Sequence, residues 1–368
     1  MKLRTRVATI RPDRRTAELS DGQTIPFDYL VFATGAHCRR PGVSGEGLEG
    51  IFCLRNVTDA VRIRRFIAER RARRAVVVGA GLVSLEMCEA FRRLDLKTTL
   101  AYRGELPMRR LGNGFSRRIL EELEGNGVAF MGNTELEAFE RAPKDGIVVH
   151  TSDGSLETDL VLLGIGVVPG VTLASEAGLA LGSTGAIAVD EHMQTDAPSI
   201  YAAGDCCESH HRVSERPVYA PLGDIANKQG RIAGANIGGQ RLSFPGIVGS
   251  ICFKVFGLEV ASTGLTEEEA REAGLKPVSA AIQGVSKAHS FPGGHELWLR
   301  LVAEAESGRL LGAQGVGGEG VVSRINTLAA ALTGDLSLEE LAYLDLAYAP
   351  PFSGAWDPIH IAAQQLSK

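Results

Sequence analysis

Short apolar runs that end at glycine recur along the chain and predict buried strands leading into turns. The clearest run, Ala75 to Val78, is followed by Gly79-Ala80-Gly81 and then by a segment rich in Ala and Leu that starts near Leu82. A β-branched run of this length favours a buried strand, and the apolar stretch after the glycines favours a helix. The sequence therefore predicts a strand, a glycine turn and a helix between Ala75 and Phe91.

This strand, turn and helix match the arrangement that binds the pyrophosphate of a dinucleotide. Gly79 allows the tight turn, Gly81 lets a phosphate approach the backbone, and the helix N-terminus supplies N–H donors. Ser84 replaces the third glycine of the motif and is small enough to keep the helix close to the strand. We expect cofactor contacts from Gly79, Ala80, Gly81 and Leu82, although glycine turns with other roles are common in α/β proteins.

The next strand, within "KTTLAYRGELPMRR", bears on which nucleotide is bound. An acid at its end would accept hydrogen bonds from an unphosphorylated ribose. Tyr102 and Arg103 stand there instead, and an arginine can hold a 2′-phosphate by charge-assisted hydrogen bonds. The sequence favours NADPH over NADH, the alternative being that Arg103 only faces solvent.

A second pattern is an internal repeat, because Ala17 to Ala36 resembles Val148 to Val167. Each copy predicts two strands joined at Ser-Asp-Gly, then an aspartate and an apolar strand ending at glycine. The second copy follows a fingerprint, whereas the same distance before the first copy falls before Met1. We expect an N-terminally incomplete first dinucleotide domain; the alternative is one nucleotide site with a decorating hairpin.

Composition narrows the class of protein. The net charge of −5 gives no reason to expect nucleic acid, and the arginine-rich stretch Arg62 to Arg74 has the apolar spacing of a solvated helix face. No apolar run reaches the length of a membrane helix and no signal peptide is recognisable, so we expect a cytoplasmic protein without membrane contact. Six cysteines without metal-ligand spacing predict no metal site.

Six motifs, read together, resemble the pyridine nucleotide-disulfide oxidoreductases, in particular the branch of coenzyme A-disulfide reductases and NADH oxidases. Besides the fingerprint they are "FDYLVFATGA" at Phe27, "DLVLLGIGVVPG" at Asp159, "IYAAGDCCE" at Ile200, "PLGDIANKQGRIAGANIGG" at Pro221 and "YAPPFSGAWDP" at Tyr348. The resemblance implies an α/β fold with two Rossmann-like dinucleotide-binding domains, the first incomplete, and a C-terminal α+β dimerisation domain.

The resemblance also implies site residues. Asp205 would bond the ribityl chain of FAD, although a helix-capping role is equally compatible with its position. Glu86 would lie near the nicotinamide and the flavin, and Tyr348 would reach the partner subunit's active site. An exposed glutamate and an ordinary interface tyrosine are the alternatives. The full set of expected cofactor contacts adds Gly166, Ala33, Thr34, Gly35, Gly204, Pro221, Leu222 and Ala226.

The family's FAD fingerprint and active-site cysteine have no counterpart in these residues, which leads us to expect an N-terminally shortened enzyme. Cys206-Cys207 adjoins the expected flavin, but neighbouring thiols serving as core filler are favoured over a strained vicinal disulfide. We expect FAD and NADPH (or NADH) as cofactors, a homodimer, and a small-molecule disulfide or an oxygen species as acceptor. The alternatives are a flavin-dependent reductase of a ferredoxin or rubredoxin, and a non-catalytic NADPH-binding dimer.

The expected domains follow from the order of the motifs. Residues 1–50 and 170–241 would form the partial FAD domain, residues 51–169 the NAD(P) domain, and residues 242–368 the dimerisation domain. The last would open at Phe244 with a strand pair and a helix.

Overall fold

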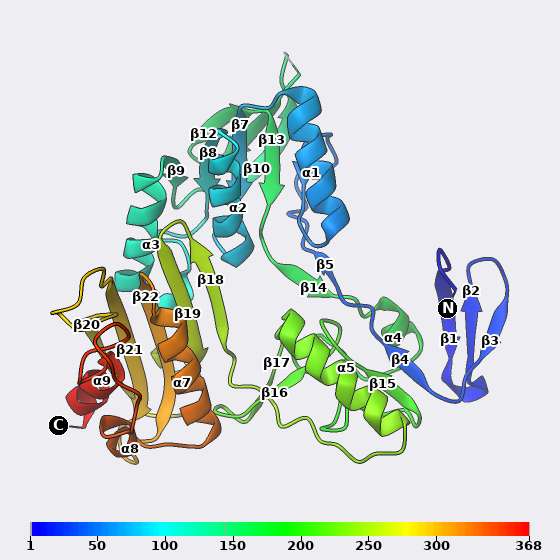
Figure 1. Ribbon diagram of the computed structural model, residues 1–368. Coiled ribbons are helices and arrows are strands. Elements are labelled where there is room, and N and C mark those ends of the chain that lie inside the picture. The colour runs from blue at the N-terminus through cyan, green and yellow to red at the C-terminus, as the bar shows by residue number, and fades with distance from the viewer. Residues whose placement is uncertain (1, 144, 368) are drawn as a thin grey trace. The chain divides into compact units, whose positions relative to one another are not determined.

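The computed structural model describes residues 2–143 and 145–367 as two compact units (Figure 1). The first unit comprises Met1–His37 and Val167–Ile247, and the second comprises Cys38–Gly166 and Val248–Lys368. Both units combine helices and strands, which agrees with the predicted α/β class.

The first unit contains the first copy of the repeat. β1 (Val7–Arg11), β2 (Thr16–Leu19) and β3 (Thr24–Pro26) form an antiparallel sheet, and β4 (Leu30–Phe32) pairs in parallel with β15 (Ile200–Ala202). Around Phe32 and Ile200 lies an apolar core. The remaining elements are η1 (Pro12–Arg14), β5 (Ala36–Cys38), β14 (Val167–Pro169), α4 (Thr172–Glu176), β16 (Ser209–His211), β17 (Arg216–Val218) and α5 (Gly223–Ile237).

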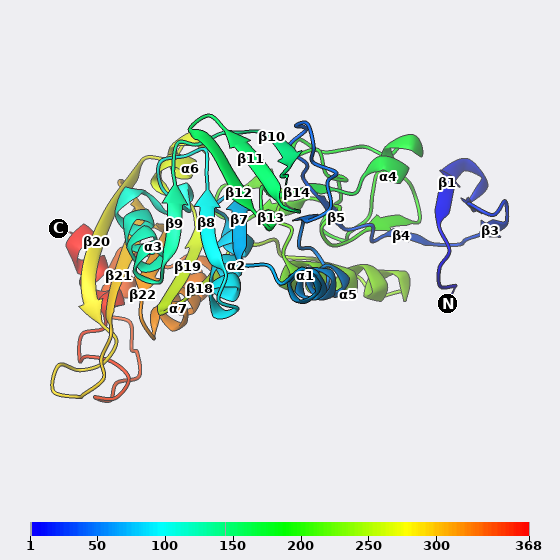
Figure 2. The same cartoon turned by 90° about the horizontal axis from the view of Figure 1, so that it is seen from above.

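The second unit is built on a five-stranded parallel sheet in the order β6-β13-β7-β8-β9. Seen from above, its helix α2 and the antiparallel ribbon β10–β12 lie on opposite sides of this sheet (Figure 2). The strands are β6 (Ile51–Phe52), β7 (Arg74–Val78), β8 (Lys97–Ala101), β9 (Val128–Met131), β10 (Leu136–Arg141), β11 (Ile147–Thr151), β12 (Gly154–Thr158) and β13 (Leu160–Leu163).

Side chains of the central strand alternate between these two layers, as strand geometry requires. Ala75 and Val77 pack in the core that includes α2 (Leu82–Arg93) and α3 (Asn113–Gly125), while Val76 and Val78 pack with β10 and β11. A strand buried on both faces needs a continuous apolar run, which explains the uninterrupted Ala75 to Val78 sequence. The predicted strand and the predicted helix start at Leu82 are confirmed.

The arginine-rich stretch belongs to α1 (Val57–Arg70), an amphipathic helix of the same unit. Ile63 is its only fully buried residue, and Phe66 packs edge-on against Phe52 with ring centroids 5.1 Å apart. The predicted solvated arginine face is confirmed.

The C-terminal part of the second unit is an antiparallel sheet in the order β18-β19-β22-β21-β20, covered by helices. The predicted strand pair and helix are confirmed as β18 (Ile251–Val255), β19 (Leu258–Gly264) and α6 (Glu267–Glu272), whereas Phe244 itself belongs to the first unit. Helix α7 (Val321–Thr333) packs on β19 and β22, and α9 (Pro358–Leu366) packs on β20 and β21. The other elements are η2 (Arg109–Leu111), β20 (Pro277–Val285), β21 (Glu296–Glu304), β22 (Leu310–Gly317) and α8 (Leu338–Ala342).

Candidate functional site

The fingerprint turn lies at the carboxyl edge of the parallel sheet, between the ends of β8 and β13. Gly79 N donates to Ala101 O at 2.9 Å, and Gly164 N donates to Val78 O at 2.8 Å. Gly79 has φ +98°, and a Cβ there would lie 2.5 Å from Gly164 O. Only glycine fits this position, because a side chain would meet both strain and backbone.

Gly81 differs from Gly79 because its surroundings are open. No atom lies within 4 Å of the position that a Cβ of Gly81 would occupy, and no side chain caps α2. The first turn of a helix leaves N–H groups without intrahelical partners, and these groups attract anions. Gly79, Ala80, Gly81 and Leu82 therefore form a turn with room and donors for a pyrophosphate.

Ser84, which stands in the position of the motif's third glycine, holds α2 close to the sheet. Its buried hydroxyl donates to Gly164 O at 3.2 Å, which joins the first turn of α2 to the end of β13. Gly166 follows two residues later, is exposed, and accepts from Arg39 N at 2.9 Å. The structure thus places Gly166 at the same sheet edge as the fingerprint.

Tyr102 and Arg103 directly follow β8, whose last residue pairs with the last residue of β7. Their position beside the glycine turn is where the ribose of a bound dinucleotide is recognised. Arg103 and Arg109 are exposed, whereas Arg110 forms a bidentate ion pair with Glu269 at 2.7 and 3.1 Å. Arg110 is therefore already engaged by a carboxylate, which leaves Arg103 and Arg109 as the candidates to meet a nucleotide.

Glu86 lies on the exposed side of α2, one turn after the fingerprint. Its partial burial, and secondly the carboxylate of Glu89, raise the pKa of Glu86. Glu89 itself has a structural role, because it accepts from Phe256 N at 2.6 Å and pairs with Arg93 at 2.5 Å. Of the two glutamates, Glu86 is the one on the accessible face.

A second group of predicted residues meets at one sheet edge of the first unit. β4 and β15 are parallel neighbours, so Ala33-Thr34-Gly35 after β4 and Gly204-Asp205 after β15 emerge side by side. Ala203 N donates to Phe32 O at 3.0 Å, and Thr34 Oγ1 donates to Gly170 O at 2.5 Å. These bonds fix both turns.

The N-terminus of α5 lies against the same edge. A Cβ on Gly204 would lie 3.4 Å from the Cβ of Ala226, in the first turn of α5. No side chain caps this helix after Pro221 and Leu222, and no atom lies within 4 Å of the Cβ position of Gly35. A carboxylate at Asp205, free helix donors and open space over glycine suit a cofactor that carries hydroxyls and an anionic ring.

Gln229 is a positioning residue of this edge that the sequence reading missed. Its buried side chain accepts from Gly204 N at 2.9 Å and donates to Ser209 Oγ at 3.0 Å. A glutamine four residues after Ile225 and four before Ala233 lies on the buried face of α5. A polar residue on an otherwise apolar helix face was the feature of the sequence that could have identified Gln229.

Cys206 and Cys207 are both buried beside this edge. Cys206 Sγ donates to Phe32 O at 3.3 Å, and Cys207 Sγ donates to Gly204 O at 3.4 Å. The bonds and burial support the interpretation of core filler. Among the described residues no cluster of His, Cys, Asp or Glu is arranged to hold a metal ion.

Tyr348 lies in the segment between α8 and α9, and its side chain is 54% exposed. Within the described parts of the chain it makes no hydrogen bond to Glu86 or to the fingerprint turn. The structure thus brings together one group of predicted residues in each unit and leaves Tyr348 on the surface.

The sequence of residues 1–230 matches the family described as pyridine nucleotide-disulphide oxidoreductase, and residues 251–358 match the dimerisation domain of that family. The chain belongs to the pyridine nucleotide-disulfide oxidoreductase family. The resemblance stated from the motifs is confirmed. Members of this family are oxidoreductases whose cofactors are FAD and NAD(P)H.

Two relatives and one solved structure define the branch. The chain is 38% identical over 355 residues to an NAD(P)H coenzyme A polysulfide/persulfide reductase of Pyrococcus horikoshii, covering 96% of this chain and 79% of the relative. It is 30% identical over 362 residues to coenzyme A disulfide reductase of Staphylococcus aureus, covering 96% and 80%. The structure of an NAD-dependent persulfide reductase from A. fulgidus superposes with a TM-score of 0.95 at 36% identity, covering 99% and 68%.

The C-terminal sheet and helices are therefore the dimerisation domain of the family. In the part of the chain that the structure describes, no helix is long and apolar enough to cross a membrane.

Proposed function

We propose that this protein is an FAD-dependent NAD(P)H oxidoreductase that reduces a small sulfur–sulfur bond, such as a coenzyme A disulfide or persulfide. The observation that carries the proposal is the presence of two glycine-lined sheet edges, each with an uncapped helix N-terminus, in a chain of this family. The relatives named for coenzyme A disulfide and persulfide reduction supply the substrate class.

Each edge takes one cofactor in this proposal. The turn of Gly79, Ala80, Gly81 and Leu82 binds the pyrophosphate of the nicotinamide nucleotide through backbone N–H groups. Tyr102 and Arg103 face its ribose, Gly166 flanks the turn, and the positive charge of Arg103 favours NADPH. Glu86, on the accessible face of α2, is assigned to the nicotinamide side.

The edge of the first unit is assigned to FAD, which when bound carries two electrons between the nucleotide and the acceptor. Asp205 accepts hydrogen bonds from its ribityl hydroxyls, and the first turn of α5 stabilises negative charge on its ring. The backbone at Ala33, Thr34, Gly35 and Gly204 lies close to the cofactor, and Pro221, Leu222 and Ala226 provide contacts at the start of α5.

The proposed domains are the FAD domain (residues 1–50 and 170–241), the NAD(P) domain (51–169) and the dimerisation domain (242–368). We assign two copies to the functional protein, with Tyr348 reaching the partner's active site. Reduction of a disulfide in this family needs a cysteine thiol that attacks the sulfur–sulfur bond. We do not assign this role to Cys88, Cys206 or Cys207, because these cysteines are buried. Oxygen or peroxide as acceptor is an outcome that the assay below distinguishes.

The test begins with the purified chain, incubated with FAD and passed through gel filtration, followed by NADPH without oxygen. We expect a co-eluting flavin band that bleaches. A colour that returns on adding coenzyme A disulfide faster than on adding oxygen would support a sulfur–sulfur bond as the acceptor. Recovery only with oxygen would move the proposal to an oxidase. Recovery only with a ferredoxin or rubredoxin would identify a carrier reductase. A colourless protein would contradict a flavoenzyme formed by this chain.

A matched pair of glycine substitutions tests the nucleotide site. Gly81→Ala places a methyl group in the open space above the turn, so the apo fold tolerates it but a phosphate meets it. We expect the KM for NADPH to rise roughly tenfold or more, since lost charge-assisted bonds are worth about 1.5–3 kcal/mol. Gly114→Ala on α3, whose Cβ position is equally open, is the control and leaves KM unchanged. Equal effects of both variants would contradict the assignment.

A further inference from the structure

The segment between α8 and α9 concentrates exposed aromatic side chains. Tyr343, Tyr348, Phe352 and Trp356 are 75%, 54%, 76% and 54% exposed, and the segment has no helix or strand. Its middle is tied to the rest of the domain by Ala288 N, which donates to Pro350 O at 3.0 Å. A segment with so little burial needs other contacts to hold one conformation.

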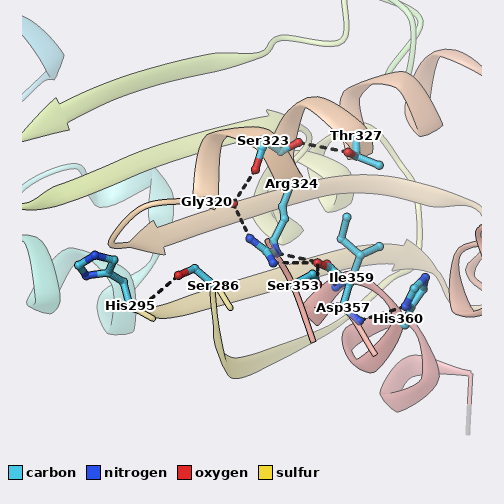
Figure 3. Close-up of polar contacts among 10 residues, drawn as sticks. All are labelled: Ser286, His295, Gly320, Ser323, Arg324, Thr327, Ser353, Asp357, Ile359 and His360. Atoms are coloured by element: carbon cyan, nitrogen blue, oxygen red, sulfur yellow. Dashed lines mark hydrogen bonds and ion pairs between the residues drawn. The ribbon is translucent and has the colours of Figure 1, made fainter. Parts of the chain in front are cut away.

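Its C-terminal end is held by a buried ion pair (Figure 3). Arg324 on α7 donates from Nη2 to Asp357 Oδ2 at 2.8 Å and from Nε to Asp357 Oδ1 at 3.2 Å. Ser353 Oγ donates to the same Oδ2 at 2.8 Å, and Ile359 N donates to Oδ1 at 3.0 Å. The Arg324 and Asp357 side chains are only 6% and 10% exposed. The carboxylate therefore has four donors, one of which belongs to the segment itself.

Its N-terminal end is held by α9. His360 Nε2 lies 2.8 Å from Leu344 O, and His360 Nδ1 lies 3.1 Å from Asp357 N. A backbone N–H can only donate and a carbonyl can only accept, so Nδ1 is the acceptor and Nε2 carries the proton. One turn later, Gln364 Nε2 donates to Ala342 O at 3.3 Å. The imidazole thus joins the start of the segment to the residue that closes its end.

We propose that Arg324, Asp357, Ser353 and His360 form a positioning unit that fixes the conformation of the segment carrying Tyr348. This inference rests on the proposed function in so far as it assigns Tyr348 to the partner's active site. The unit acts through the segment and touches no substrate. It holds both ends, so the aromatic side chains between them are presented in one arrangement.

The type of bond supports positioning rather than stability alone. Burying an arginine and an aspartate costs desolvation that their attraction only about repays, so a buried pair is weak support for stability. The guanidinium fork instead fixes direction, because two parallel N–H groups meet two carboxylate oxygens. Arg324 Nη1 is in turn held by Gly320 O at 2.9 Å, which orients the fork from the start of α7.

Ser353→Ala is the variant that tests the unit, because it removes one hydroxyl and leaves the ion pair paired. The matched control is Ser286→Ala in the same domain. Ser286 is also buried, and its hydroxyl also makes one hydrogen bond, accepting from His295 N at 3.0 Å, but this bond joins two residues outside the segment (Figure 3). Thr327→Ala, an exposed hydroxyl on α7 bonded to Ser323 O, is a second control.

The first readout is amide hydrogen exchange of the whole 368-residue chain. We expect Ser353→Ala to speed exchange of the peptide spanning residues 343–357 roughly fivefold, the factor that corresponds to one lost hydrogen bond, with peptides of α7 unchanged. Neither control alters this peptide. Exchange in the Ser353→Ala segment equal to that of the unaltered protein would overturn the proposal, whether or not the protein is catalytically active.

The second readout is turnover with coenzyme A disulfide, compared with reduction of the bound flavin by NADPH. Ser353→Ala should slow turnover by about the same factor and leave flavin reduction unchanged, whereas a general loss of stability would affect both. The double variant with Tyr348→Phe should be no slower than Tyr348→Phe alone. Additive losses would overturn positioning of Tyr348. If Tyr348→Phe leaves turnover unchanged, the assigned role of Tyr348 fails, while the exchange result still decides whether the unit holds the segment.

Discussion

The two copies of the repeated segment fold alike but have different neighbours. Each forms two antiparallel strands joined at a glycine with positive φ, Gly22 or Gly154, followed by a strand of a parallel sheet. β13 has a neighbour on each side, β6 and β7, whereas β4 pairs with β15. Leu162 of β13 is fully buried, and the matching Val31 of β4 is 40% exposed. Burial is therefore set by the surrounding sheet and not by the repeated sequence.

The turns that follow these two strands differ at their first residue. After β13, Gly164 touches the fingerprint so closely that Gly79 must lack a side chain. After β4, Ala33 takes the matching place. The later glycines of the two turns, Gly35 and Gly166, are alike, because neither has an atom within 4 Å of its Cβ position. The turn after β13 therefore supports a neighbouring backbone through Gly164, while both turns border open space at their last glycine.

The largest effect expected from this difference is in the strands themselves. Leu162→Ala should lower the free energy of unfolding of the second unit by about 2–5 kcal/mol, because it leaves a cavity in a packed core. Val31→Ala should cost less than about 1 kcal/mol, because its side chain is already partly hydrated. Urea unfolding followed by hydrogen exchange of each strand measures the two separately. Equal losses would contradict the difference in burial.

The second comparison concerns the glycines. Gly79→Ala combines positive φ with a clash against Gly164 O, so we expect a loss of about 3 kcal/mol in the free energy of unfolding and no binding of NADPH. Gly35→Ala carries only the strain of positive φ and should cost about 1–2 kcal/mol. Thermal melting and nucleotide titration check both. If the Gly79→Ala and Gly35→Ala proteins melt at the same temperature, a clash between the new side chain and Gly164 O is refuted.

How far the sequence could predict these features depends on how many positions along the chain separate the interacting residues. The fingerprint from Ala75 to Leu82 is local, and the position of Tyr102 follows from the rule that consecutive parallel strands are neighbours. The bond from Gly204 to Gln229 and the pair Arg324–Asp357 join residues 25 and 33 positions apart. Such pairs depend on how helices pack against sheets, and a lone polar residue on an apolar stripe does not identify its partner.

The smallest expected effect concerns the aspartates that precede the matching strands β13 and β4. Asp159 accepts from Arg73 N and Arg74 N at 2.7 and 2.9 Å and pairs with Arg74 Nη2 at 3.0 Å, whereas the matching Asp28 is exposed. Burial alone would raise the pKa of Asp159, but these donors together outweigh it and lower the pKa.

A lowered pKa in the folded state means that Asp159 stabilises the protein above its unfolded pKa of about 4, and that this contribution is lost as the pH falls through the lower folded value. Asp159→Asn should therefore cost about 1 kcal/mol at pH 7, since an amide accepts more weakly than a carboxylate. The gap from the unaltered protein should close as the pH drops below about 4, and Asp28→Asn should show no gap. Urea midpoints between pH 7 and pH 3 measure this. A gap for Asp159→Asn that stays constant with pH would show that its carboxylate charge contributes nothing, and the two copies would then differ in packing alone.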